Sequence, residues 1–227
     1  PVITYSKNSG TFFNVGITTV TMTATDGCGN SATCTFTVTV NDTTKPTVIT
    51  KPVTLYLNAL GTATLLTANV NNGSYDNCAI TSLTLSKTSF NCSNIGPNVV
   101  TLTAKDAANN MGMNTAVVTI LDTLKPNVTC KNITVDLVNG TKTITPIQVR
   151  LTATDNCGTP SLSINKSTFT CADPINNNVV LTATDASGNS KTCTSVVTIR
   201  YKPTCSITLT PATGAYTGGI PNNVYLG

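Results

Sequence analysis

A repeated segment is the strongest constraint on how this chain can fold. The heptapeptide Val-Thr-Met-Thr-Ala-Thr-Asp at 20–26 recurs in closely similar form at 100–106 and 179–185, at spacings of 80 and 79 residues. An Asn follows four residues after the Asp of each copy, and a second alternating run comes next. Repetition at this period indicates an array of similar modules. The predicted parts are the C-terminal half of a module at 1–45, complete modules at 46–122 and 123–200, and the start of a further β-domain at 201–227.

Alternation of apolar residues with Thr predicts strands inside each repeat. Val20, Met22 and Ala24 fall on one face, and the intervening Thr residues fall on the other. This period of two is typical of strands with one buried and one solvated face. Thr makes up roughly a fifth of the chain and Glu is absent, which favours strands over helices. Several short strands in just under 80 residues predict an all-β protein of tandem immunoglobulin-like β-sandwich modules.

The composition excludes several classes of function. The chain has no His, so it lacks an imidazole base, a Ser-His or Cys-His pair and a His-containing zinc site. No nucleophile elbow or phosphate loop is present, and we therefore expect no enzyme activity. The 13 basic residues form no long run or stripe, so nucleic acid is not an expected partner. No stretch approaches the apolar length needed to cross a bilayer. The strand-like start at Pro1 suggests a piece cut from a longer protein.

Nine Cys residues without a CxxC pair favour disulfides and an oxidising, extracellular compartment. Comparison of the copies suggests how they pair. The positions equivalent to Cys130 and Cys193 are Thr50 and Asn114, so both cysteines are lost together in the preceding module, as a bonded pair would be. Four cysteines in one module still permit three connectivities. The predicted disulfides are Cys130–Cys193, Cys157–Cys171 and Cys78–Cys92.

Three cysteines have no predicted partner in a complete module. Cys34 aligns with Cys193, so we expect its partner before Pro1. Cys28 could bond Cys34 or another upstream cysteine, and Cys205 is expected to pair beyond the end of the chain. Reactive free thiols are the alternative.

Several strings in the third repeat resemble the HYR (hyalin repeat) domain. They are Lys-Pro-x-x-x-Cys at 125–130, Ala-Thr-Asp-Asn-Cys at 153–157, Phe-Thr-Cys at 169–171 and Leu-Thr-Ala-Thr-Asp-Ala-Ser-Gly-Asn-Ser-Lys-Thr-Cys at 181–193. The resemblance is to HYR modules found in tandem in very large surface and secreted proteins of Bacteroidota, including gliding-motility adhesins. It implies an extracellular immunoglobulin-like spacer or fibre on a bacterial surface, with no active site. The alternative is a module that itself binds glycan or protein. Expected partners are neighbouring modules of the same chain, with surface glycans or other cell-surface proteins as further candidates.

Acidic residues in the expected turns form two candidate metal sites. In an immunoglobulin-like sandwich, the B–C and F–G turns share one end with the junction from the preceding module. That placement groups one Asp from each of the three segments, and calcium prefers six to eight oxygen ligands. The alternative, favoured by the absence of bidentate Glu, is that these carboxylates accept backbone hydrogen bonds in turns. The two trios are Asp42, Asp76, Asp106 and Asp122, Asp155, Asp185.

The junctions also contain candidate glycosylation sites. Thr43 and Thr123 each follow an Asp in a pattern that matches the Asp-Thr/Ser-apolar acceptor of periplasmic O-glycosylation in the phylum that the resemblance implies. A glycan on these Thr residues would shield the junctions from solvent. An ordinary turn is the alternative.

Overall fold

The computed structural model describes residues 1–201. These residues divide into two compact units, and each is described by itself. The first unit comprises 1–128, 152–161 and 183–191, and the second comprises 129–151, 162–182 and 192–201. The helices are single turns of three or four residues, so strands determine the architecture.

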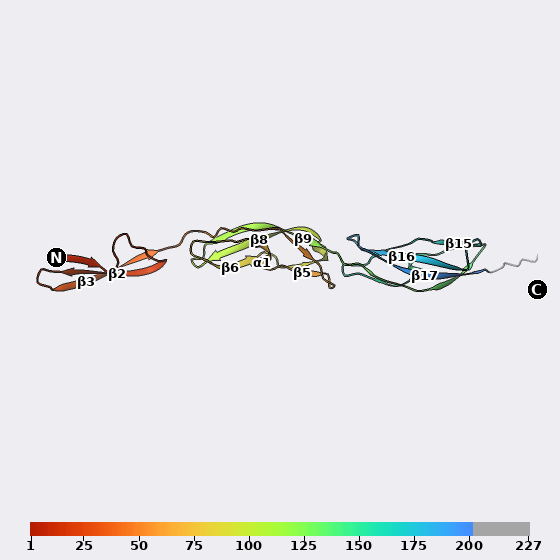
Figure 1. Cartoon of the computed structure of the whole chain (residues 1–227), viewed down its shortest axis with the longest axis horizontal. Coiled ribbons are helices and arrows are strands. Elements are labelled where there is room, and N and C mark those ends of the chain that lie inside the picture. Colours follow the sequence, from red (N-terminus) through yellow and green to blue (C-terminus); the bar gives the residue numbers. More distant parts are fainter. Residues whose placement is uncertain (202–227) are drawn as a thin grey trace, which may run out of the picture. The chain divides into compact units, whose positions relative to one another are not determined.

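Residues 1–40 form an antiparallel sheet in the order β1 (Val2–Tyr5), β2 (Gly16–Thr25) and β3 (Ser31–Val40) (Figure 1). Val20 is 1% exposed, whereas Phe12 is 95% exposed and lies outside the strands. A single sheet cannot bury an apolar face by itself, which explains why much of the apolar surface of this segment is open.

A four-stranded sheet and a two-stranded sheet make up most of the rest of the first unit. Its elements are β4 (Val53–Tyr56), β5 (Thr62–Thr64), α1 (Thr67–Val70), β6 (Ile80–Leu85), β7 (Ser89–Asn91), η1 (Cys92–Asn94), β8 (Gly96–Asp106) and β9 (Met111–Leu121). The larger sheet has the order β4-β9-β8-β6, in which β4 is parallel to β9 and the other pairs are antiparallel. β5 pairs with β7 in the smaller sheet. Figure 1 shows β8 and β9 together in this unit.

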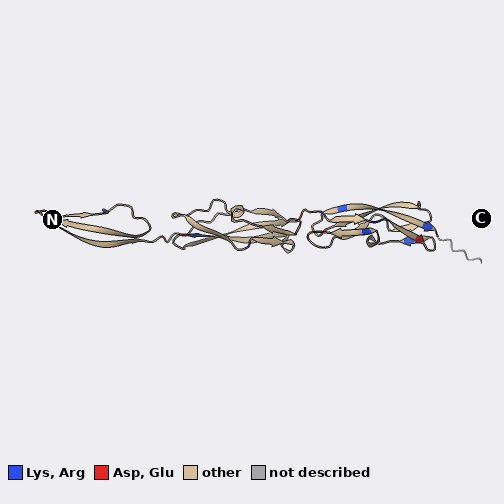
Figure 2. Ribbon diagram, turned by 90° about the horizontal axis from the view of Figure 1, so that it is seen from below, with Lys and Arg blue, Asp and Glu red and all other residues tan. Residues whose placement is uncertain are grey.

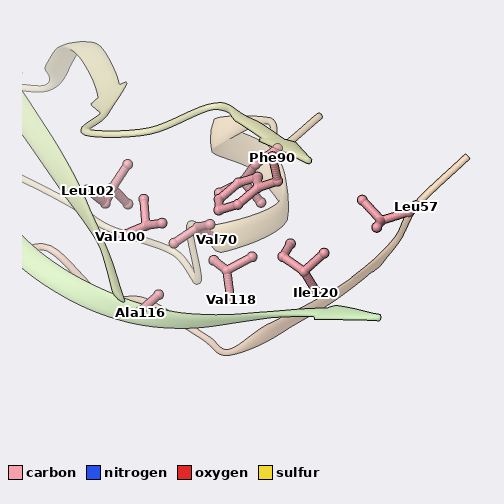
Figure 3. Close-up of a cluster of buried hydrophobic side chains, with 9 residues drawn as sticks. Leu57, Val70, Phe90, Val100, Leu102, Ala116, Val118 and Ile120 are labelled. Atoms are coloured by element: carbon pink, nitrogen blue, oxygen red, sulfur yellow. The ribbon is translucent and has the colours of Figure 1, made fainter. Parts of the chain in front are cut away.

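The core of the first unit follows the predicted alternation. Val100 and Leu102 of β8 are fully buried, whereas the Thr residues beside them are partly exposed. Figure 3 shows them with Val118 of β9 and, from the opposite side, Phe90 of β7 and a valine of α1. Burial of each such aliphatic or aromatic side chain contributes roughly 1.5–3 kcal/mol. The apolar faces of the two sheets therefore hold this part of the chain together.

The same sheet order recurs in the C-terminal part of the described chain. Its elements are β10 (Asn127–Cys130), β11 (Ile133–Leu137), β12 (Thr141–Thr143), α2 (Pro146–Val149), β13 (Arg150–Thr154), β14 (Ser161–Ile164), β15 (Thr168–Thr170), β16 (Asn176–Thr184) and β17 (Ser190–Tyr201). The larger sheet has the order β11-β17-β16-β14, with β11 parallel to β17, and β10 pairs with β13 and β12 with β15. Phe169 and Leu181 are fully buried, like the equivalent Phe90 and Leu102.

The order β6-β8-β9 corresponds to the C, F and G strands of an immunoglobulin-like sandwich. The predicted fold class, all-β with immunoglobulin-like sandwiches and disulfides, is therefore confirmed. The exact module boundaries stay a prediction, and the β-domain predicted at 201–227 lies almost wholly outside the described residues.

No helix in residues 1–201 is long and apolar enough to cross a membrane. In Figure 2, Lys and Arg appear as separate short segments of the ribbon.

Candidate functional site at the repeat junctions

Each copy of the repeated motif ends in a turn built by an Asp and an Asn. Asp106 Oδ1 accepts a hydrogen bond from Asn110 N at 2.8 Å, and Oδ2 accepts one from Asn110 Nδ2 at 2.8 Å. Asp185 and Asn189 make the same pair of bonds, at 2.8 and 2.9 Å. The bonds close the turn because both oxygens of one carboxylate are held by one Asn.

The same Asn also binds the junction that arrives from the preceding repeat. Asn110 Nδ2 donates to the backbone oxygen of Asp42 at 3.1 Å, and Asn189 Nδ2 donates to that of Asp122 at 3.1 Å. The sequence shows that an Asn recurs here, but it does not show this second contact. The signal in the sequence is that this Asn recurs four residues after the Asp of each copy. Each Asn therefore joins a turn and a junction that are 67 or 68 residues apart.

The structure brings each predicted trio of Asp residues together. One carboxylate oxygen from each of Asp122, Asp155 and Asp185 lies within 4.8 Å of the other two, and the trio Asp42, Asp76 and Asp106 is arranged in the same way. Asp155 is fixed by a hydrogen bond that its Oδ2 accepts from Cys157 N at 2.9 Å. The predicted grouping is thus present, whereas calcium binding stays a prediction.

Some oxygens in these trios have no hydrogen-bond partner although they are buried. Asp122 is only 6% exposed; its Oδ1 accepts hydrogen bonds from Leu124 N and Asn156 Nδ2, both at 3.2 Å, while its Oδ2 accepts none. Buried polar atoms in proteins are nearly always partnered, so each exception needs an explanation. The unpartnered buried oxygens are Asp122 Oδ2, Asp155 Oδ1, Asn156 Oδ1, Asp42 Oδ2 and Asp76 Oδ1.

Local contacts shift the titration of two groups in the first trio. The hydrogen bond from Thr44 N, at 3.0 Å, lowers the pKa of Asp42. Contact with the Asp42 carboxylate, together with burial, raises the pKa of the Cys78 thiol. A raised pKa reduces the thiolate fraction, so Cys78 is a weak nucleophile at neutral pH.

The disulfide predicted between Cys130 and Cys193 is confirmed, with Cα atoms 5.7 Å apart. In the preceding repeat, hydrogen bonds connect the equivalent positions to the opposite strand. Thr50 Oγ1 donates to Thr115 O at 2.6 Å, and Asn114 Nδ2 donates to Val48 O at 3.1 Å. The two repeats therefore join the same strands by different chemistry.

The other two predicted disulfides, Cys78–Cys92 and Cys157–Cys171, are wrong. Cys92 is instead bonded to Cys157, 65 residues later, with Cα atoms 5.3 Å apart. Cys78 and Cys171 are free cysteines. The observed disulfide thus connects the repeat at 46–122 to the repeat at 123–200, whereas the prediction placed one bond inside each.

Strand length explains the error for Cys78 and Cys92. Cys78 lies near the end of β8, where Asp106 contributes to its electrostatic environment, whereas Cys92 comes four residues before the start of β8. The strand has 11 residues, and at about 3.3 Å per residue it spans roughly 36 Å. A disulfide requires Cα atoms closer than about 7 Å. Cys78 and Cys92 therefore lie at opposite ends of a long strand.

A close backbone approach positions Cys92 for its distant partner. Cys92 Sγ lies 3.6 Å from Gly61 O and 3.5 Å from Asn156 O. Asn156 Nδ2 also donates to Asn58 O at 3.3 Å, which ties the turn before Cys157 to the same place. Gly61 has φ +68°, and a Cβ there would lie 2.7 Å from both Asn156 O and Cys92 Sγ. Only glycine fits this position without displacing its neighbours.

The remaining predicted sites have mixed outcomes. Cys171 Sγ donates to Gly140 O at 3.6 Å, in the same relation that Cys92 has to Gly61. Cys28 and Cys34 are exposed and free. Cys205 lies outside the described residues. Thr43 and Thr123 are exposed at their junctions, and their glycosylation stays a prediction.

Comparison with known proteins gives one family match and two curated relatives. Residues 1–40 match the HYR domain. The chain is 32% identical to hyalin of Lytechinus variegatus over 167 residues, which is 71% of this chain and 32% of that protein. It is 31% identical to hyalin of Strongylocentrotus purpuratus over an alignment of 237 residues, which covers all of this chain and 19% of that protein. The chain thus spans about a third or less of each relative.

Among solved structures, the chain is similar to extracellular domains of a protocadherin and to domains of a cadherin. Extracellular cadherin domains 1–4 of protocadherin gamma B7 give a TM-score of 0.35 at 11% identity, covering 82% of this chain and 58% of that one. Domains EC22–24 of mouse cadherin-23 give a TM-score of 0.36 at 16% identity, covering 82% and 74%. The HYR match and the hyalin relatives, not these structures, support HYR-like repeats in an extracellular protein.

Proposed function

We propose that this chain is a structural segment of a large extracellular adhesive protein, in which consecutive HYR-like repeats are joined through both a disulfide and a hydrogen-bonded junction. The observation that carries this proposal is the bond between Cys92 and Cys157. A disulfide that connects one repeat to the next adds little to recognition of a ligand. It does prevent the two repeats from separating when one of them loosens.

The expected energetic effect of this bond is large for a segment of this size. The loop that it closes spans 65 residues, and on the chain-entropy model such a crosslink contributes about 4 kcal/mol by restricting the unfolded chain. Asn156 and Asn189 add hydrogen bonds to the residues of the junction and of the preceding repeat. Repeat proteins gain stability from interfaces between neighbours, and here the interface is also covalent.

The similarity to hyalin and the disulfides support an extracellular location for this proposal. The spacer or fibre role on a bacterial surface, and the connection with gliding motility, remain our proposal. The partners that we propose are neighbouring repeats of the same chain. Glycan or protein binding by the repeats themselves is the alternative function, and we expect no enzyme activity from either.

Force spectroscopy on the whole oxidised chain tests the structural role. We expect the wild type to resist unfolding to a higher force than the variant Cys92→Ser/Cys157→Ser, because the variant lacks the bond between repeats. The free cysteines Cys78 and Cys171 offer a matched control, since Cys78→Ser/Cys171→Ser also removes two sulfurs but no bond. This control should unfold at the wild-type force.

Two results would contradict the proposal. The first is an equal unfolding force for the wild type and the Cys92→Ser/Cys157→Ser variant. The second is saturable binding of the folded chain to immobilised glycans or to a cell-surface protein, which would favour the alternative function. A chain that shows no such binding and loses mechanical strength without the disulfide would support the structural role.

A further inference from the structure

We propose that Asp122, Asp155 and Asp185 bind a calcium ion, and that Asp42, Asp76 and Asp106 form an equivalent second site. The two trios are 79 or 80 residues apart at each position and repeat the same geometry. This inference does not depend on the proposed structural role. It rests on charge, burial and unpartnered oxygens.

The first step is the concentration of negative charge. One oxygen from each of the three carboxylates lies within 4.8 Å of the others. Asp122 is 6% exposed and Asp185 is 9% exposed, so water screens their charges poorly. In the described part of the chain, the ion pairs are Lys166–Asp173 and Arg200–Asp136, and neither involves a trio. Three carboxylates at this spacing repel one another unless a positive charge lies between them.

The second step is the presence of oxygens with nothing to bind. Asp122 Oδ2 is buried and has no hydrogen-bond partner, and the same is true of Asp155 Oδ1. The side-chain oxygen of Asn156 is also unpartnered, on an amide whose nitrogen contacts Asp122. If these Asp side chains served only as acceptors for backbone N–H groups, their remaining oxygens would not need to be buried. Hydrogen bonds from neighbouring residues outside the trio hold its other oxygens and leave these available.

The third step is the match to calcium. Calcium binds oxygen ligands at 2.3–2.6 Å, so two ligands of one ion stand up to about 5 Å apart. The oxygens of each trio fall within that limit. Magnesium has shorter bonds, requires near-ideal octahedral geometry and releases its water reluctantly. Carboxylates from three separate loops, with an amide oxygen beside them, fit the more irregular coordination of calcium.

Asp155 is the member of its trio that lies at a surface depression. Asp155 lines a shallow surface depression together with Asn156, Leu124 and Lys125. No ion pair joins Lys125 to a carboxylate of the trio among the described residues. The depression opens to solvent beside Asp155.

Calorimetric titration of calcium into the chelator-treated whole chain tests the proposal. We expect about two ions per chain, up to calcium concentrations of about 10 mM, because extracellular modules bind calcium with dissociation constants on the order of 0.1–1 mM. Calcium should also raise the melting temperature, because it binds the folded state only. Magnesium at the same concentration should cause a smaller rise.

The variant Asp155→Asn separates ion binding from a purely structural role. Asn keeps an oxygen that can accept the bond from Cys157 N, but it removes the charge. We expect one bound ion in this variant, one in Asp76→Asn, and none in the double variant. In chelator, Asp155→Asn should melt at the wild-type temperature or above it, because one repulsive charge is gone. Asp122→Asn provides an independent test of the same site if Asp155→Asn does not fold.

The chain offers a matched control for these variants. Asp26 makes the same two bonds with Asn30 that Asp185 makes with Asn189, at 2.9 and 3.0 Å, but it belongs to neither trio. Asp26→Asn should still bind two ions. Absence of binding up to 10 mM, two ions in the double variant, or a magnesium response equal to that of calcium would each overturn the proposal. A folded Asp155→Asn variant that melts below the wild type in chelator and still binds two ions would also overturn it, since that result indicates a structural acceptor only.

Discussion

At the scale of single residues, small polar side chains perform the connecting roles in this chain. Asn110 and Asn189 each satisfy both oxygens of a turn Asp and one backbone oxygen of the arriving junction. Asn156 reaches both a junction carboxylate and the preceding repeat. In each contact that it makes here, the Asn side chain acts as a donor, through the two hydrogens of its Nδ2. The amide suits these positions because it can donate to two acceptors from a short stem.

Asp173 gives a prediction on the dependence of stability on pH. The ion pair with Lys166, helped by the hydrogen bond from Thr170 N at 2.8 Å, lowers the pKa of Asp173. A carboxyl with a lowered pKa in the folded state stabilises the fold above its unfolded value of about 3.9, and that contribution is lost as the pH falls through the folded pKa. We therefore expect Asp173→Asn to be less stable than the wild type at pH 7, with a difference that shrinks as the pH falls below 4.

Chemical denaturation of both proteins at a series of pH values checks this prediction. Lys166→Met serves as the control, because it removes the partner and should weaken the same dependence on pH. A difference in stability between wild type and Asp173→Asn that stays constant from pH 7 to pH 2 would show that the ion pair does not couple to folding.

At the scale of elements, long strands separate the functional ends of each sandwich. The strand β8 extends from Gly96 to Asp106, with the Asp cluster near its end and Cys92 before its start. This length allows one end to hold a junction and the other end to offer a cysteine to the next repeat. The link near the start of each repeat differs between the copies. It is the disulfide Cys130–Cys193 in one repeat, and hydrogen bonds from Thr50 and Asn114 in the repeat at 46–122.

Restoring the missing cysteines in the repeat at 46–122 should stabilise it. The variant Thr50→Cys/Asn114→Cys places two thiols at the positions of Cys130 and Cys193, whose Cα atoms are 5.7 Å apart. A crosslink over this distance in sequence contributes about 4 kcal/mol, and loss of the two side-chain hydrogen bonds costs about 1 kcal/mol each. We expect a net gain of roughly 2 kcal/mol in the free energy of unfolding.

Thermal or chemical denaturation of the oxidised variant measures the gain. The reference is the same variant after selective reduction and alkylation of the new disulfide. The single variant Thr50→Cys is the matched control, since it loses a hydrogen bond and can form no new bond with position 114. A double variant that oxidises fully but is no more stable than the single variant would show that the two strands do not have the geometry of their counterparts.

At the scale of the whole molecule, the repeats are connected by more than the polypeptide chain. The disulfide between Cys92 and Cys157 and the asparagine contacts lie at one junction. Free Cys78 has the same position relative to its Asp as Cys157 has, since Cys78 N donates to Asp76 Oδ2 at 2.9 Å. Free Cys171 has the same contact with a glycine oxygen as Cys92 has. A series of such repeats could therefore be crosslinked from each one to the next.

Tryptic mapping of the non-reduced chain tests the connectivity directly. Cleavage after Lys and Arg places Cys92 in the peptide 88–105, Cys157 in 151–166 and Cys171 in 167–191. We expect a linked pair of 88–105 with 151–166, which should separate on reduction. The linked Cys130 and Cys193 peptides serve as an internal control. A linked pair of 151–166 with 167–191 would instead support a bond within one repeat and would contradict the observed arrangement.

The sequence by itself determined the repeat, the alternating strands and the composition of both Asp trios, because these depend on periodicity and on which residues occupy turns. Val100 and Leu102 are buried as their alternation with Thr predicts. The sequence also identified the disulfide Cys130–Cys193, because both of its cysteines are missing together from the preceding repeat. Only the tertiary structure decided the partner of Cys157. An alignment of the copies does not give the distance between the two ends of a strand. Cys78 and Cys92 therefore looked like neighbours, although a strand of 11 residues separates their ends of the sandwich.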